Sequence, residues 1–124
     1  MTEIREYEVR ASSTSTYGRV LLSARDQHLV VDGPAQNGCP GEAVTPGELF
    51  LGAVAACGVE LLQVIAHDHD LGLTEATAVA HGVLDPGNRV REDVNVFNAV
   101  TLSFELHGVG DEDAALLVEA FKGR

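Results

Sequence analysis

The sequence predicts an α+β fold in which antiparallel β-sheets wrap around one long, buried central helix. Residues 49–66 are apolar apart from Glu60 and Gln63, with apolar side chains at every helical angle and a length too great for a strand. On both sides of this segment, shorter runs alternate between apolar and polar residues, which is the pattern of half-buried strands. The length of 124 residues fits a single domain over residues 1–124.

Charge and hydropathy exclude several classes of partner. The net charge of −11 and the lack of Lys and Arg clusters argue against binding to nucleic acid. Glu60 and Gln63 interrupt the apolar helix before it reaches the ~20 residues that a membrane span needs, so we expect no membrane partner. The N-terminus has no apolar stretch typical of a signal peptide, which indicates a cytoplasmic protein.

Three strands are expected before the helix. Residues 2–12 alternate, with a slip of one position that is explained either by a bulge or by a late start of the strand. Residues 17–24 form the second strand, residues 25–27 the hairpin turn, and residues 28–32 the third strand. The short turns between these runs favour an antiparallel meander.

A long loop leads from the third strand into the central helix. Residues 33–47 are rich in Gly and Pro and carry Cys39, and loops of this length are often functional. Thr45 is a suitable N-cap and Pro46 suits the first helical position. The helix is expected to end near Asp68.

Two strands and a helix are expected to complete the chain. Residues 74–84 alternate, with small side chains on one face that would let a helix approach closely. A turn at residues 85–88 follows, and residues 99–109 alternate as a half-buried strand. Residues 111–122 form an amphipathic helix. Its expected apolar stripe comprises Leu116, Leu117, Ala120 and Phe121.

The central helix needs cover on all sides because its apolar side chains point in every direction. The two groups of strands in one chain can cover only part of it. We therefore expect a homodimer in which two such helices pack side by side.

Cys57 lies near the middle of the central helix and has two interpretations. It is either a small buried hydrophobic residue or a nucleophile, and a nucleophile needs a nearby cation or helix N-terminus to favour the thiolate. Arg19 on the second expected strand is the leading candidate for that cation, the alternative being an exposed strand arginine. Glu60 lies one turn after Cys57, and its charge would oppose ionisation of the thiol unless an arginine paired with it.

The other candidate residues also have a structural alternative. Glu48 in the first helical turn is a candidate catalytic residue, and its simplest role is to complement the helix dipole. Cys39 is either an ordinary loop residue or a resolving thiol that condenses with a sulfenic acid on Cys57. The His and Asp residues at 67–70 resemble a solvated helix end rather than a metal site, and the cysteines match no usual zinc spacing.

Residues 45–62 read TPGELFLGAVAACGVELL and resemble a segment of the OsmC/Ohr family, the osmotically inducible protein C and organic hydroperoxide resistance proteins. In that family, a Pro-Glu-containing start leads through small residues to Ala-Cys. The segments GRV, DPGN, TLSFELHGV and DEDAALLVEAF follow in the family's order, so the resemblance covers essentially the whole chain. It implies an OsmC-like fold and an intertwined homodimer with sheets around paired central helices.

The resemblance also implies a reaction, namely thiol-dependent reduction of organic hydroperoxides in oxidative-stress defence. Cys57 matches the peroxidatic cysteine, which attacks the peroxide and becomes a sulfenic acid. A second cysteine then forms a disulfide that a dithiol such as a lipoyl protein reopens, and no metal or organic cofactor takes part. Arg19 loosely matches either the family's activating arginine or a neighbouring arginine of the family's loop, and Cys39 is the only other cysteine in the sequence.

The sequence also departs from the family pattern. Peroxidatic members place Glu directly after the Pro, whereas this position is Gly47 here and the acidic residue is Glu48. The family's resolving cysteine usually follows the last helix, and Cys39 instead precedes the central one. These differences leave a second interpretation, a non-catalytic OsmC-like protein that binds a small apolar ligand in the dimer cleft.

Overall fold

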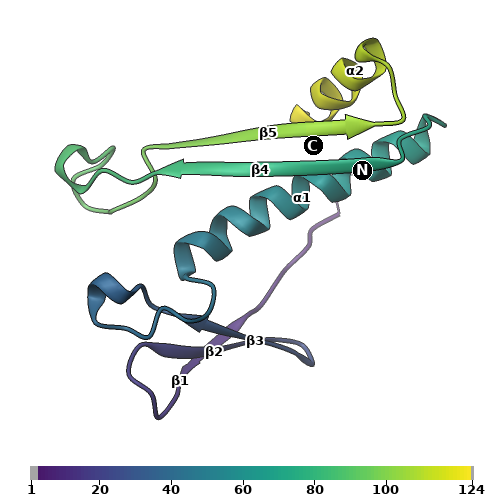
Figure 1. Cartoon of the computed structure of the whole chain (residues 1–124). Coiled ribbons are helices and arrows are strands. Elements are labelled where there is room, and N and C mark those ends of the chain that lie inside the picture. Colours follow the sequence, from purple (N-terminus) through teal and green to yellow (C-terminus); the bar gives the residue numbers. More distant parts are fainter. Residues whose placement is uncertain (1–2, 124) are drawn as a thin grey trace. The chain divides into compact units, whose positions relative to one another are not determined.

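The computed structural model describes residues 3–123, and its α+β class and antiparallel sheets confirm the predicted architecture (Figure 1). The chain divides into two compact units, Met1–Leu49 and Phe50–Arg124. The elements, in order, are β1 (Arg10–Ser13), β2 (Arg19–Ala24), β3 (Gln27–Asp32), α1 (Pro46–Asp68), β4 (Glu75–Val83), β5 (Ala99–His107) and α2 (Asp111–Lys122), with short 3-10 helices at Ala35–Asn37 and Pro86–Asn88.

The first unit contains the antiparallel meander β1-β2-β3. The turn between β2 and β3 has two residues rather than the expected three, and Arg25 adopts the positive φ of 56° that such tight hairpin turns require. Gln27 therefore belongs to β3 and pairs with Ala24. Counting outward from this pair places Arg19 directly opposite Asp32.

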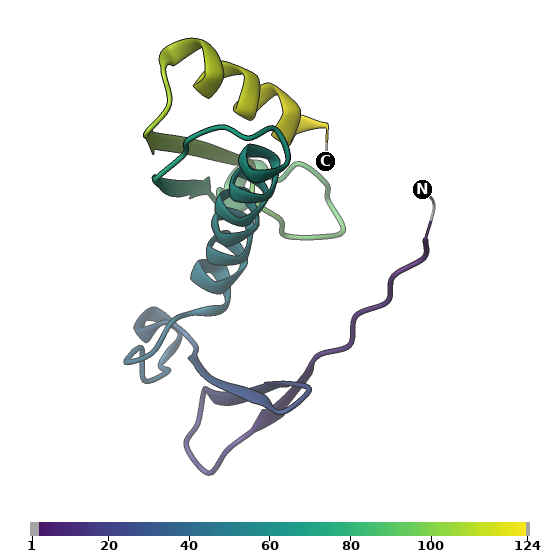
Figure 2. The same ribbon diagram turned by 90° about the vertical axis from the view of Figure 1, so that its right-hand side faces the viewer.

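The slip in the N-terminal alternation reflects a late start of β1 at Arg10 rather than a bulge. Residue 2, where the expected strand began, lies outside the described residues. The segment before β1 runs as an extended chain (Figure 2). Its apolar side chains at Ile4, Tyr7 and Val9 are 88%, 85% and 55% exposed.

The long helix α1 ends at the predicted residue, Asp68, but a single chain covers only one of its faces. The buried residues are Gly58, Leu62, Ile65 and Ala66. In residues 3–123, α1 is the one helix long and apolar enough to cross a membrane by length and composition, a test that core helices of soluble proteins also pass.

In the second unit, β4 and β5 form an antiparallel pair that packs against the buried face of α1. The small residues of β4 lie on the half-buried face, as predicted. A methyl group added at Gly58 would lie 3.0 Å from the Phe104 ring, so this glycine allows close contact between helix and sheet. Leu62, Ile65 and Ala66 form the core together with Leu117 of α2.

The apolar stripe of α2 differs from the prediction. Leu116 is 60% exposed and Ala120 is also exposed, whereas Leu117 is only 1% exposed. The side that faces the core passes through Ala114, Leu117 and Phe121 because these residues follow the three-and-four spacing from the one buried leucine.

Candidate functional site

Cys57 is a free and exposed thiol near the middle of α1, in the second unit. It belongs to a row of exposed side chains that recur every three or four residues, which places them on one helix face. We call this row the exposed stripe of α1; it comprises Phe50, Ala53, Cys57, Glu60 and Val64.

The exposed stripe is apolar except for the thiol and one carboxylate. Between Glu48 and His67, Glu60 is the only charged side chain on α1. The stripe lies opposite the face that contacts β4 and β5, and therefore opposite the hydrophobic core. A small molecule or a second protein chain that reached this stripe would meet Cys57 directly.

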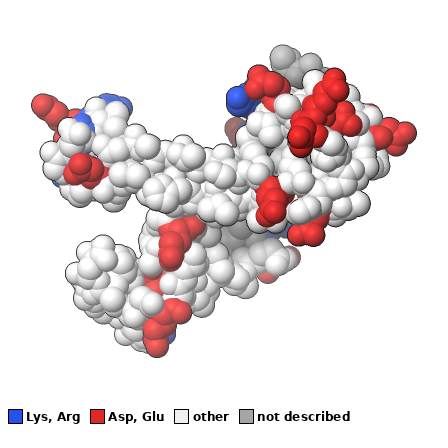
Figure 3. Space-filling model, turned by 45° about the horizontal axis from the view of Figure 1, so that its top comes forward, with Lys and Arg blue, Asp and Glu red and all other residues white. Residues whose placement is uncertain are grey.

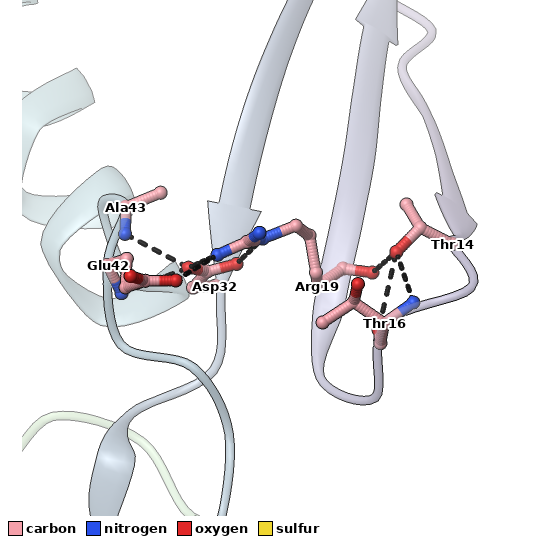
Figure 4. A network of polar contacts seen from close by, with 6 residues as sticks. All are labelled: Thr14, Thr16, Arg19, Asp32, Glu42 and Ala43. Carbon is pink, nitrogen blue, oxygen red and sulfur yellow. Dashed lines mark hydrogen bonds and ion pairs between the residues drawn. The ribbon is translucent and has the colours of Figure 1, made fainter.

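Arg19 lies in the first unit and binds two carboxylates (Figure 4). Its Nε donates to Asp32 Oδ1 at 2.8 Å, and its Nη2 donates to Asp32 Oδ2 and to Glu42 Oε1, both at 2.9 Å. These hydrogen bonds, first with Asp32 and then with Glu42, raise the pKa of Arg19 above its ordinary value. The guanidinium charge is therefore shared between two carboxylates.

Asp32 accepts four of the hydrogen bonds in this network. Its side chain is fully buried, and two of the four, each of 3.0 Å, come from the backbone N–H groups of Glu42 and Ala43. The hydrogen bonds from Arg19 are the main reason that its pKa falls to about 2, although burial acts in the opposite direction. Asp32 thereby ties the long loop after β3 to the meander.

Sequence reasoning did not find Asp32, although a signal was present. With a two-residue turn at Arg25 and Asp26, the hairpin register alone places Arg19 opposite Asp32. The expected three-residue turn shifted the register by one position and concealed this cross-strand pair. Glu42 carried no comparable signal because it lies in the loop.

Glu48 forms a capping box with Thr45 at the start of α1. The backbone N–H and the hydroxyl of Thr45 both donate to Glu48 Oε1 at 3.0 Å, and the backbone N–H of Glu48 donates to Thr45 Oγ1 at 3.3 Å. The backbone hydrogen bond, and then that from the hydroxyl, lower the pKa of Glu48. Its carboxylate therefore stabilises the helix N-terminus, which is the simplest of its predicted roles.

Cys39 lies in the loop of the first unit, half-buried between two glycines. A methyl group added at Gly18 or at Gly33 would lie 2.5 Å from Cys39 Sγ, so a side chain at either position would force the Cys39 side chain to shift. The thiol of Cys39 also faces the carbonyl oxygen of Asn37 at 3.9 Å. These contacts show tight packing around this thiol.

The candidate residues thus divide between the two units. Arg19, Cys39 and Glu48 belong to the first and Cys57 to the second. Within the first unit, Arg19 binds Glu42 of the loop between β3 and α1, and Cys39 of the same loop lies against Gly18, the residue before Arg19. The catalytic roles assigned to the four residues from the sequence remain predictions.

The polar side chains that the structure describes elsewhere do not form a metal site. Within residues 3–123, no group of three or more His, Cys, Asp or Glu side chains is arranged to hold a metal ion. Acidic side chains outnumber basic ones on the surface, and many of them gather over the end of the second unit that carries α2 (Figure 3). This charge favours neither phosphate groups nor nucleic acid as ligands.

Known structures share this fold. An OsmC-like protein from Mycoplasma pneumoniae superposes with a TM-score of 0.82 at 13% identity, covering 97% of this chain and 82% of that protein. An organic hydroperoxide resistance protein from Elizabethkingia anophelis gives 0.73 at 18% identity, covering 98% and 84%. An organic hydroperoxide resistance protein OsmC from Legionella pneumophila gives 0.71 at 20% identity, covering 97% and 84%.

Sequence comparison gives the family itself. No protein of curated function matches the chain. The family model for the OsmC-like protein matches residues 39–123, which include the loop cysteine, α1 with Cys57, both strands of the second sheet and α2. The chain therefore belongs to the OsmC-like protein family.

Proposed function

We propose that this protein reduces organic hydroperoxides through the Cys57 thiol, as part of cytoplasmic defence against oxidative stress. The observation that carries the proposal is the free, exposed thiol in the middle of the long helix of an OsmC-like chain. Two of the proteins that share its fold are named organic hydroperoxide resistance proteins. Their names indicate the substrate class to test.

The proposed reaction begins at the sulfur of Cys57. The thiolate attacks the distal oxygen of the hydroperoxide, the O–O bond breaks, and the organic part leaves as an alkoxide that takes up a proton. Cys57 becomes a sulfenic acid and the hydroperoxide becomes an alcohol. A dithiol such as a lipoyl protein then supplies two electrons, releasing water and restoring the thiol.

The proposed active form is a homodimer. The exposed stripe of α1 leaves Phe50 54% exposed and Val64 36% exposed in the single chain. Apolar side chains in a continuous row favour association because their burial removes apolar surface from water. A second copy with its own stripe is the simplest partner of matching shape and chemistry.

One observation favours the non-catalytic alternative, the binding of a small apolar ligand in the dimer cleft. Arg19 and Glu48 are the two charged residues that sequence reasoning assigned to catalysis, and both bind partners within the first unit. If neither charge assists Cys57, the apolar stripe would serve only to bind a ligand.

An activity assay distinguishes the peroxidase from the ligand-binding function. It measures turnover of an organic hydroperoxide in the presence of a dithiol for the wild type, Cys57→Ser and Cys39→Ser. We expect Cys57→Ser to abolish consumption of the hydroperoxide. A Cys39→Ser variant that stalls as the sulfenic acid would identify Cys39 as the resolving thiol. Equal rates in the wild type and Cys57→Ser would refute the proposed peroxidase.

A further inference from the structure

We propose that Glu60 is a catalytic residue that exchanges a proton with Cys57 during reduction of the hydroperoxide, an inference that rests on the proposed function. The two residues are three positions apart on the exposed stripe of α1. At this spacing the Cβ atoms of two helical residues lie about 5–6 Å apart. Helical side chains lean toward the N-terminus, so rotation of the Glu60 side chain can bring its carboxylate over the turn that carries Cys57.

Glu60 is free to take this role. None of the side-chain hydrogen bonds and ion pairs found in residues 3–123 involves its carboxylate. The nearest charged or titratable residues on the same helix are Glu48 and His67, and the rise per residue places them about 18 Å and about 10 Å from Glu60 along the axis.

Within residues 3–123, the strands and the helix packed against the buried face of α1 present no charged side chain to it, and Phe97, between β4 and β5, stacks on Phe50. The buried face of α1 contacts the half-buried face of the β4–β5 pair, which is built from apolar side chains and glycine. The members of that face are Ala76, Ala78, Ala80, Gly82, Leu102, Phe104 and Leu106. Leu117 and Phe121 of α2 extend the same apolar core, so Glu60 is the charged group within reach of Cys57 in these elements.

In the proposed exchange, Glu60 takes a proton from Cys57 before the attack and gives it to the leaving group afterwards. The Glu60 carboxylate accepts the proton of the Cys57 thiol, and the resulting thiolate attacks the distal oxygen of the hydroperoxide. As the O–O bond breaks, the protonated Glu60 returns the proton to the leaving alkoxide, which becomes an alcohol. Sulfur is oxidised to the sulfenic acid, the peroxide is reduced by two electrons, and Glu60 ends as it began.

The return of the proton distinguishes oxidation from alkylation. Both reactions need the Cys57 thiolate, but only the alkoxide that leaves during oxidation needs a proton from Glu60. Alkylation by iodoacetamide releases iodide, which needs no proton. Removing the Glu60 carboxyl group should therefore slow oxidation of Cys57 by a hydroperoxide more than it slows alkylation.

The experiment compares these two rates in the same protein. Site-resolved mass spectrometry follows Cys57 during single-turnover oxidation by cumene hydroperoxide and during alkylation by iodoacetamide, in the wild type, Glu60→Gln and Glu60→Asp. General acid–base catalysis typically contributes about 10²–10⁴-fold. We expect the ratio of oxidation rate to alkylation rate to fall by at least about tenfold in Glu60→Gln, and to recover partly in Glu60→Asp.

The matched control is Gln63→Ala, because Gln63 is exposed on the same helix but carries no charge. Its rate ratio should equal that of the wild type. An unchanged ratio in Glu60→Gln, with a reactive wild type, would overturn the role of Glu60 and leave the peroxidase proposal standing. A wild-type Cys57 that alkylates but resists the hydroperoxide would overturn both.

Discussion

At the scale of single residues, Asp32 is the buried charge on which the first unit depends. Its carboxylate has no exposure to solvent and is surrounded by Arg19 and two backbone N–H groups of the loop. A buried ion pair is costly to break because the remaining partner keeps its charge without compensation. The ion pair between Arg19 and Glu42 is different, since the side chain of Glu42 is 76% exposed.

Asp32→Asn should therefore destabilise the protein while Glu42→Gln should not. We expect the first substitution to lower the melting temperature by about 5–10 °C, because it leaves the Arg19 guanidinium without its main partner. Glu42→Gln should lower it by no more than about 2 °C, since exposed ion pairs contribute little. Thermal unfolding followed by circular dichroism measures both melting temperatures. Equal decreases in the two variants would contradict the difference between the buried and the exposed ion pair.

The same residue predicts how stability depends on pH. The folded protein holds the pKa of Asp32 at about 2, below its ordinary value of 3.8. Because the folded pKa is the lower one, the stabilisation is complete above about pH 4 and is lost as the pH falls from about 4 to about 2. In urea unfolding, the difference between the wild type and Asp32→Asn should shrink over this range. A difference in stability that does not change with pH would argue that the ion pair is not its source.

At the scale of elements, α2 shows how one position decides which side of a helix is buried. Leu116 and Leu117 are adjacent and chemically identical, yet their exposures are 60% and 1%. Sequence periodicity placed both on the apolar stripe because a broad stripe can include two neighbouring positions. Contact with Leu62 and Ile65 of α1 selects Leu117.

Leu117→Ala and Leu116→Ala form a matched pair that tests this assignment. Leu117→Ala should lower the free energy of unfolding by about 2–4 kcal/mol, from lost burial and from the cavity left behind. Leu116→Ala should lower it by less than about 1 kcal/mol because most of its side chain is already exposed. Chemical denaturation measures both losses of unfolding free energy. A larger loss in Leu116→Ala than in Leu117→Ala would contradict the assignment of Leu117 to the core.

The loop between β3 and α1 depends on the fit of one thiol between two glycines. Gly33→Ala would place a methyl group 2.5 Å from Cys39 Sγ, so the substitution should destabilise the first unit by about 1–3 kcal/mol. Cys39→Gly removes the obstructing side chain. The double variant should therefore be more stable than the sum of the two single effects, by at least about 0.5 kcal/mol in a double-mutant cycle. Additive effects would show that the two side chains do not contact each other.

At the scale of the whole molecule, the exposed stripe of α1 predicts a dimer. Each chain has a mass of 13.1 kDa, so light scattering at micromolar concentration should give twice that value. Val64→Asp should shift the protein toward the monomer because it places a second negative charge in the stripe, four residues from Glu60. Val79→Asp on the exposed face of β4 is the control and should leave the dimer intact. A wild-type mass of one chain would contradict the dimer.

Much of the fold could be predicted because its signals are local. The limits of α1 followed from an N-cap at Thr45, a proline at the first position and the end of the apolar run, and its last residue was correct. The two-residue turn at Arg25 and Asp26 was missed because neither residue is the usual glycine or asparagine. That one-residue error was enough to hide the pairing of Arg19 with Asp32.

The sequence by itself determined the class of elements, their order, the family resemblance and the position of the thiol on the central helix. The tertiary structure alone decided that Arg19 also binds Glu42 of the loop, and that Cys39 fits between Gly18 and Gly33. The reason is that periodicity and capping act over a few neighbouring residues. The partner of a charged or buried side chain is instead fixed by segments that meet only when the chain folds.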